Sequence, residues 1–203
     1  MEALSHLRRM IASLDEALVD ALGARSRLGF DPAFYALPAD ALPGLNELAG
    51  AFADAATPAG RVRVLRPAFL AGLLPGLCAG APDNGPAPCL AADAACLDAL
   101  ARRLALSVHV ATRKREAVPE GLQAALNTRD PARVEAAITH AGVETEVLAR
   151  VRARAGQPPA DPGLPDRIAR LYADWIIPLS RKIQVHGLLA DAGGEPSTTL
   201  PRP

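Results

Sequence analysis

The sequence lacks the short motifs that hold metals, nucleotides or redox cofactors. Its three cysteines, Cys78, Cys89 and Cys96, show no CxxC spacing, and an odd number cannot all pair with one another. There is no glycine-rich phosphate loop and no HExxH pair. These absences indicate a reduced, intracellular chain. They argue against a zinc-dependent or nucleotide-driven enzyme and leave chemistry that side chains carry out without a cofactor.

Excess charge of either sign is also missing. The 22 basic and 22 acidic side chains cancel, so no overall field attracts the chain to nucleic acid or to an anionic membrane. No stretch approaches the roughly 20 apolar residues of a membrane-spanning helix. The start, MEALSHLRRM, carries charges where a signal peptide needs an apolar run. We therefore expect a soluble, cytoplasmic protein in which any anion binding comes from a local site.

Patterns typical of strands are scarce, whereas helix-forming residues are abundant. β-Branched residues are few, alternating apolar and polar runs are hard to find, and alanine is plentiful. About half of the 203 residues are apolar, which suits one compact domain better than two. The composition predicts an all-α protein, a single-domain helical bundle of about six to eight helices.

Apolar residues three and four positions apart predict where these helices lie. In the first one, Leu4, Leu7, Ile11, Leu14 and Leu18 share one face. Helical segments are expected over residues 4–27, 45–55, 67–77, 93–116, 119–126, 131–155 and 166–189.

Capping residues and prolines predict several of the boundaries. The string GAPDNGPAP over residues 80–88 predicts a surface loop, and Asp93 occupies a helix N-cap position after it. Asp130 is a second expected cap, with Pro131 in the first helical turn. Pro178 falls inside the last helix and predicts a kink there.

Polar residues lie where helical periodicity predicts burial. Arg103 and Lys114 are eleven residues apart, which returns them to nearly the same helix face. Ser180 and Gln184 lie one turn apart on the same helix face. Glu144 lies on an otherwise apolar face of its own helix, where an unpaired carboxylate would be costly to bury. Two interpretations remain open. In the first, these residues form solvated basic patches and helix–helix hydrogen bonds. In the second, they line an internal site for an anionic, oxygen-rich small molecule.

Three strings resemble a known family, the all-helical chorismate mutases, in its larger fungal and plant branch. LRRMIASLDEALVDAL at 7–22 resembles the opening helix, and CLDALARRLALSVHVATRKRE at 96–116 resembles the central helix. LYADWIIPLSRKIQVHGLL at 171–189 is similar to the closing helix, whose I-P-L-[TS]-K-x-V-[EQ]-V pattern is specific. The resemblance covers residues 1–30 and 93–190 and fails between them. It implies a mutase domain over residues 1–190. The remaining residues, 191–203, have too little apolar surface to be ordered by themselves, so we expect a disordered tail there.

The resemblance implies a role for each matching position. Arg8 and Arg103 would bind the substrate carboxylates, and Ser180 would position one of them. Lys114 would contact a carboxylate and the ether oxygen, and Gln184 the ether oxygen. Glu144 would bind the ring hydroxyl. The implied reaction is the rearrangement of chorismate to prephenate in aromatic amino acid biosynthesis, with Arg103, Lys114 and Gln184 catalytic and with no cofactor or metal.

The resemblance also implies a homodimer that binds this small molecule and no nucleic acid or membrane. Ala87 and Pro88 replace the glycine–serine pair of the regulated relatives, so we expect neither activation by tryptophan nor inhibition by tyrosine. His140 stands where relatives often carry an amide, and two roles stay open for it, filling space at the pocket rim or contacting the substrate; we do not expect it to be catalytic.

Two other readings remain open. One is a related enzyme that acts on isochorismate or on 4-amino-4-deoxychorismate, because a carboxylate at Glu144 suits a ring hydroxyl or a ring ammonium. The other is a non-catalytic helical regulatory module.

Overall fold

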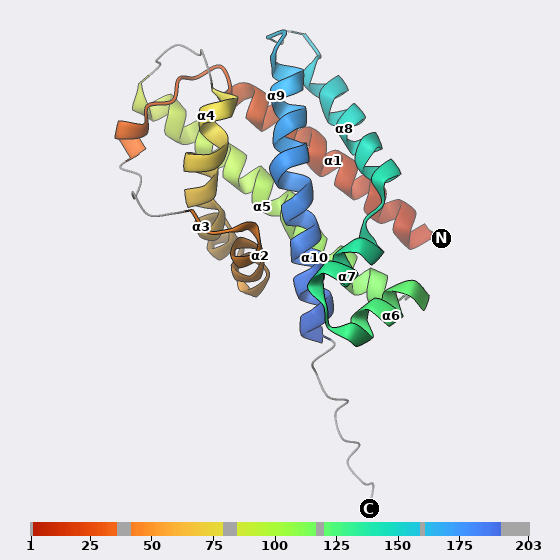
Figure 1. Cartoon of the computed structure of the whole chain (residues 1–203). Coiled ribbons are helices and arrows are strands. Elements are labelled where there is room, and N and C mark those ends of the chain that lie inside the picture. The colour runs from red at the N-terminus through yellow and green to blue at the C-terminus, as the bar shows by residue number, and fades with distance from the viewer. Residues whose placement is uncertain (1, 36–41, 79–84, 117–119, 159–160, 192–203) are drawn as a thin grey trace, which may run out of the picture.

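The computed structural model describes residues 2–35, 42–78, 85–116, 120–158 and 161–191, and within these ranges it contains helices and no strand (Figure 1). This confirms the predicted all-α class. The helices form eight rods, because two of the rods each join two α-helical segments through a π-helical turn. The α-helices are α1 (Glu2–Arg25), α2 (Leu45–Asp54), α3 (Pro58–Ala68), α4 (Leu74–Leu77), α5 (Pro86–Glu116), α6 (Glu120–Thr128), α7 (Pro131–Ile138), α8 (Ala141–Ala155), α9 (Leu164–Leu171) and α10 (Ile177–Asp191).

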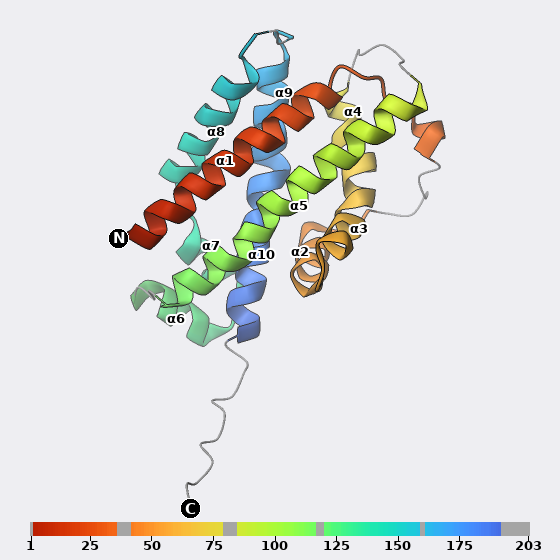
Figure 2. The ribbon, with the colours of Figure 1, turned by 180° about the vertical axis from the view of Figure 1, so that it is seen from behind.

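The long helix α5 is the centre of the arrangement. It packs against α1 along much of its length and crosses α10 on another side (Figures 1 and 2). Helix α8 lies against α1 and α9, and α2 packs on α10. Helices α6 and α7 pack together at the end of the bundle where α5 finishes. Side chains on the inner faces of α1, α5, α8 and α10 can therefore meet.

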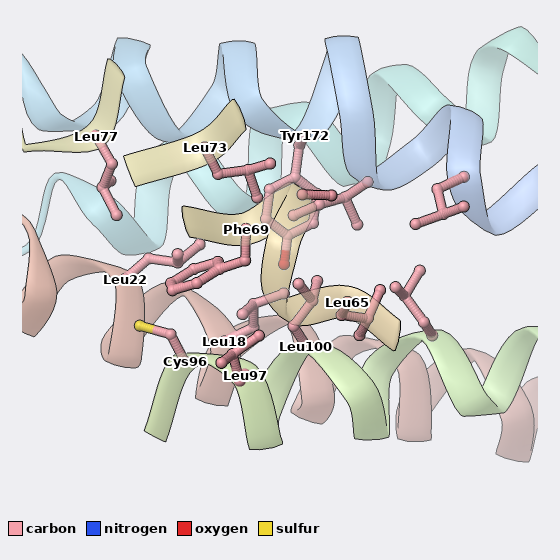
Figure 3. Close-up of a cluster of buried hydrophobic side chains, with 14 of the residues drawn as sticks. Leu18, Leu22, Leu65, Phe69, Leu73, Leu77, Cys96, Leu97, Leu100 and Tyr172 are labelled. Carbon is pink, nitrogen blue, oxygen red and sulfur yellow. The ribbon is translucent and has the colours of Figure 1, made fainter. Parts of the chain in front are cut away.

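The main core forms where α1, α5 and the α3–α4 rod converge. Figure 3 shows Leu18 and Leu22 of α1 close to Leu97 and Leu100 of α5, with Phe69 from the α3–α4 rod between them. All five are at most 4% exposed. Each buried leucine contributes roughly 1.5–3 kcal/mol to folding. This core holds α1 and α5 in the relative position that the polar residues need.

Helix α5 begins earlier than predicted. It starts at Pro86, so residues 86–88 are helical, and the expected surface loop over 80–88 is wrong for that part; residues 80–84 lie outside the described residues. A proline in the first turn loses no hydrogen bond, because the N–H groups there have no intrahelical partner. Asp93 is therefore inside the helix and does not cap it.

Asp93 instead belongs to a buried ion pair. It is 4% exposed, and its Oδ1 accepts a 2.6 Å hydrogen bond from Nε of the fully buried Arg25. Its Oδ2 accepts another, also 2.6 Å, from the hydroxyl of Tyr35. The remaining guanidinium nitrogens of Arg25 donate to backbone carbonyls of Leu28 and Gly29, to Tyr35 and to the Cys78 sulfur. This cluster fastens the end of α1 to the start of α5.

The helix predicted over residues 131–155 is interrupted. Asp130 caps its start as predicted, accepting a 2.9 Å hydrogen bond from the Ala132 N–H. Thr139 and His140 then adopt extended backbone angles and separate α7 from α8. The Thr139 hydroxyl donates to the Glu135 carbonyl at 2.7 Å, so this side chain takes an acceptor from the helical ladder. The break leaves the Ile138 carbonyl free to accept from elsewhere.

Pro178 is accommodated by a π-helical turn and not by a break. The turn spans Tyr172–Ile176, immediately before the proline, and joins α9 to α10 in one rod. Proline has no N–H and its ring clashes with the carbonyl four residues earlier, and a wider turn relieves that clash. A second π turn, Phe69–Leu73, stands in the same relation to Pro75.

Helix α3 begins at Pro58, where Thr57 caps it through the Gly60 N–H, earlier than the predicted segment at 67–77. The proposed tail lies almost wholly outside the described residues, since residues 192–203 are not described. No helix in the described ranges has the length and apolarity that crossing a membrane requires.

Buried thiols predict that the fold loses stability at alkaline pH. Burial raises the pKa of Cys78 to about 11 and that of Cys96 to about 12, from an ordinary value of 9.0. Above pH 9 the unfolded chain releases these protons while the folded chain keeps them. The free energy of unfolding therefore falls as pH rises from about 9 towards 11. Urea unfolding at pH 8 and pH 10.5 measures this decrease in the free energy of unfolding. The decrease should be smaller in the Cys78→Ala/Cys96→Ala variant than in the wild type, and equal decreases would contradict the prediction.

Candidate active site

A buried carboxylate, Asp15 of α1, is at the centre of a polar network inside the bundle. It is 1% exposed, and its Oδ1 accepts from Nε of Arg103 at 2.6 Å and from the hydroxyl of Tyr172 at 3.2 Å. Its Oδ2 accepts from Nη2 of Arg150 at 2.7 Å. Asp15 thus ties α1 to α5, to α8 and to the π turn before α10.

Sequence analysis missed Asp15, although the chain carries a signal for it. Ile11, Asp15, Leu18 and Leu22 follow a spacing of four, three and four residues, so a carboxylate interrupts the apolar stripe of α1. The partner Arg150 carried no such signal, because its position on α8 gives no indication of which helix lies opposite.

Arg103 lies inside the bundle with part of its guanidinium still available. Its side chain is 7% exposed, so the alternative of a solvated basic patch is wrong for this residue. The neighbouring Arg102 is exposed and pairs with Asp98 on the surface. Within the described part of the chain Arg103 donates only through Nε. Both of its Nη groups therefore remain able to bind a carboxylate.

Ser180 and Gln184 lie in the contact between α5 and α10, and each is 8% exposed. The hydroxyls of Ser107 and Ser180 are 2.6 Å apart and share a hydrogen bond across the two helices. Gln184 Nε2 donates to the Ser180 carbonyl at 3.2 Å, one turn back on its own helix. Its Oε1 is buried without a hydrogen-bond partner in the described structure. An amide held so weakly can turn its N–H groups towards a ligand.

Lys114 lies farther along α5, half-buried. Its Nζ donates to the Ile138 carbonyl at 3.2 Å, and in the described ranges no carboxylate is within ion-pair distance. Burial lowers its pKa, because the ammonium loses water without gaining an opposite charge. An anion beside Lys114 would remove that penalty.

Glu144, at the start of α8, is paired with a basic residue of α10. Its Oε1 accepts a 2.6 Å hydrogen bond from Nη1 of Arg181, and its side chain is 28% exposed. Nε of Arg181 also lies 3.3 Å from Oε1 of Glu135 on α7.

Two of the residues singled out in the sequence, Arg8 and His140, lie outside these networks in the described structure. Arg8 is exposed on α1, and His140 is exposed in the α7–α8 connection. The role predicted for Arg8 stays a prediction. A cavity of about 300 Å³ between α1, α8 and α9 includes none of the predicted site residues in its lining, and two of its three charged residues, Asp20 and Arg154, pair with each other at 2.6 Å.

Inward-facing groups of α5 and α10, supported by α1 and α8, thus make up a candidate site with basic and neutral hydrogen-bond donors. Among the described residues, both Nη groups of Arg103 are without a partner and Lys114 has no counter-ion, and the Gln184 amide can reorient. This arrangement defines an all-helical protein that can bind a small oxygen-rich anion between its helices.

The family comparison agrees with that class. Residues 90–185, a little under half of the chain, match the family model for type II chorismate mutases. The matched segment contains Arg103, Lys114, Glu144, Ser180 and Gln184.

Similar curated proteins are chorismate mutases of fungi and plants. The chain is 31% identical to the chorismate mutase of Pichia angusta over 130 residues, which are 58% of this chain and 46% of that protein. It is 36% identical to the Schizosaccharomyces pombe enzyme over 107 residues, 48% of this chain and 43% of that one. Chorismate mutase 1 of Petunia hybrida, a chloroplastic protein, is 29% identical over 135 residues, 60% and 42% of the two chains. The matching part therefore spans less than half the length of these relatives.

Solved structures show the same fold over nearly the whole chain. The Candida albicans chorismate mutase Aro7p, in complex with L-Trp, superposes with a TM-score of 0.73 at 21% identity, covering 96% of this chain and 93% of that one. AtCM1 with tyrosine in its allosteric site gives a TM-score of 0.70 at 20% identity, covering 93% and 96%. The unmatched middle of the sequence thus keeps the helical architecture.

Asp15 should support stability as well as site geometry. The Asp15→Asn substitution leaves the buried Arg103 without its counter-charge, and breaking a buried pair in this way costs about 3–5 kcal/mol. We expect a loss at the lower end of that range, because Arg150 is 35% exposed and can reach water. Urea unfolding measures it. The control Asp20→Asn removes the surface partner of Arg154 and should change stability far less; equal losses in the two variants would contradict the special position of Asp15.

Proposed function

We propose that this protein is a chorismate mutase, which isomerises chorismate to prephenate. The observation that carries the proposal is the guanidinium of Arg103, buried, fixed by Asp15 through Nε and still open at both Nη groups. It lies in a segment that matches the type II chorismate mutase family.

Conformational restraint is the first part of the mechanism. Chorismate is a dianion that must fold its enolpyruvyl arm over its ring before it can react. The Arg103 fork would bind one carboxylate in two parallel hydrogen bonds, and the Lys114 ammonium would attract the other charge. Holding both ends in the reactive geometry removes most of the entropic cost of the rearrangement.

Electrostatic stabilisation of the transition state is the second part. The C–O bond to the ether oxygen breaks ahead of C–C bond formation within one molecule, so no atom is gained or lost. Negative charge grows on the ether oxygen as this happens. Lys114 and the Nε2 group of Gln184 would donate to that oxygen, and donors placed there stabilise the transition state more than the ground state.

The shared contact of Ser107 and Ser180 supports this assignment, because it fixes the turn of α10 that carries Gln184. Asp15 acts as a positioning residue, since it touches Arg103 and not the reacting atoms. Glu144 keeps Oε2 free of protein donors in the described structure, which suits acceptance of a hydrogen bond from the ring hydroxyl.

On the basis of the family resemblance, we extend the proposal to the protein's oligomeric state, cellular location and pathway. The chain would act as a cytoplasmic homodimer in aromatic amino acid biosynthesis. The lack of response to tryptophan and tyrosine, expected from Ala87 and Pro88, stays part of the proposal. Two similar structures carry L-Trp or, in an allosteric site, tyrosine, so both amino acids are the relevant effectors to test.

The function is tested by loss of chorismate absorbance together with prephenate formation. Arg103→Ala removes a donor pair used in the transition state, and such a loss lowers kcat by about 10²–10³-fold. Arg102→Ala, next in the chain but exposed and paired on the surface, should leave activity within about twofold of wild type. An inactive wild type, or an active Arg103→Ala variant, would contradict the proposal.

The pH profile tests the role of Gln184 separately. An amide donates its N–H at any pH, so kcat/KM should vary little between about pH 5 and 8. The Gln184→Glu variant has a donor only while its carboxyl group is protonated, and its activity should decline as pH rises through that interval. A steep decline in the wild type over the same interval would argue against donation by Gln184.

A further inference from the structure

The contact between Glu144 and Arg181 suggests how the site selects its substrate. Glu144 is the acidic residue proposed to face the ring substituent, and a free carboxylate binds an ammonium better than a hydroxyl. In this protein it is not free: Nη1 of Arg181 donates to its Oε1 at 2.6 Å. The basic partner comes directly after Ser180, which the Ser107 contact holds in place.

Four charged side chains form this cluster across α7, α8 and α10. Arg181 lies between Glu144 and Glu135, with its Nε 3.3 Å from Oε1 of Glu135. Nζ of Lys182 lies 3.5 Å from Oε2 of Glu135. Two positive and two negative side chains balance, and each is between 24% and 28% exposed. Solvent therefore screens the cluster only in part.

The balance has a chemical consequence for whatever binds at Oε2 of Glu144. A neutral hydroxyl can donate to that oxygen without changing the charge of the cluster. A ring ammonium would add a third cation within reach of Arg181, and like charges in a partly desolvated site repel. Removing Arg181 would leave a net negative cluster that attracts an ammonium.

We propose that Arg181 is a specificity-determining positioning residue: through its ion pair with Glu144 it favours substrates with a ring hydroxyl over those with a ring ammonium. The inference rests on the proposed function. Chorismate and its 4-amino analogue differ in this one group and can undergo the same isomerisation. Arg181 thereby discriminates between the substrates of two of the functions that the sequence leaves open.

The test compares kcat/KM for chorismate with kcat/KM for 4-amino-4-deoxychorismate, and the ratio of the two is the readout. In Arg181→Gln the ratio should fall by about fivefold to tenfold, the size of one charge removed at a partly exposed site. Arg181→Lys keeps the charge and should stay within about threefold of wild type. A merely structural role for Arg181 would lower both rates together and leave the ratio unchanged, which would overturn the proposal.

Lys182 provides the matched control. Lys182→Gln removes the same charge from the next residue, but its partner is Glu135 and not Glu144. The ratio should change by less than about threefold. Equal shifts in Arg181→Gln and Lys182→Gln would mean that overall charge, and not the contact with Glu144, sets the preference, and would overturn the assignment.

Glu135→Gln makes the test independent of whether Arg181→Gln folds. Loss of the competing carboxylate leaves Arg181 to Glu144 alone, so the ratio should move in the opposite direction, towards the hydroxyl. A shift towards the ammonium, or no shift, would contradict the proposal.

The proposed function and the role of Arg181 fail in different ways. A wild type that consumes neither compound contradicts the proposed function itself. A wild type that is active on chorismate, with a ratio that the Arg181 variants leave unchanged, contradicts only the role of Arg181.

Discussion

Burial of the Asp15 carboxylate is the constraint on which the rest of the site depends. A charge this far from water must be surrounded by donors, and here the donors come from Arg103, Arg150 and Tyr172 on three different segments. The same contacts that satisfy Asp15 decide where α1, α5, α8 and the π turn lie relative to one another. They also orient Arg103 so that its Nε faces the protein and its Nη groups remain unused. The packing of the helices and the orientation of Arg103 thus rest on one carboxylate.

The second buried ion pair shows how a structural arginine differs from the one proposed to bind the substrate. Arg25 and Arg103 each place Nε 2.6 Å from a buried aspartate. Arg25 then uses both of its remaining nitrogens, on carbonyls, a phenol hydroxyl and a thiol, so no guanidinium nitrogen is without a partner. Arg103 has no further partner in the described part of the chain. The count of unused donors, and not burial, separates the two roles.

Departures from regular helix position several of the polar groups. The π turn before Pro178 contains Tyr172, and the rod continues into α10 to present Ser180 and Gln184. The interruption at Thr139 exposes the carbonyl of Ile138, which accepts from Lys114. A regular helix through Thr139 would have kept the Ile138 carbonyl in its own hydrogen-bond ladder. Proline and a hydroxyl side chain, both local features of the sequence, therefore act on the site through backbone geometry.

The sequence by itself determined the all-helical class, most of the helix positions, the cap at Asp130 and the inward polar residues of α5 and α10, because helical periodicity and capping are local properties of the chain. It did not determine the start of α5 or the break between α7 and α8, where a proline string and a threonine side chain are compatible with either outcome. Only the tertiary structure decided the partners: Asp15 with Arg103 and Arg150, Arg25 with Asp93, Glu144 with Arg181. Each of these pairs joins residues at least 37 positions apart, and no local pattern specifies which helices will meet. The physical reason is that a periodic face shows that a side chain is buried, whereas its charge partner depends on how the helices pack.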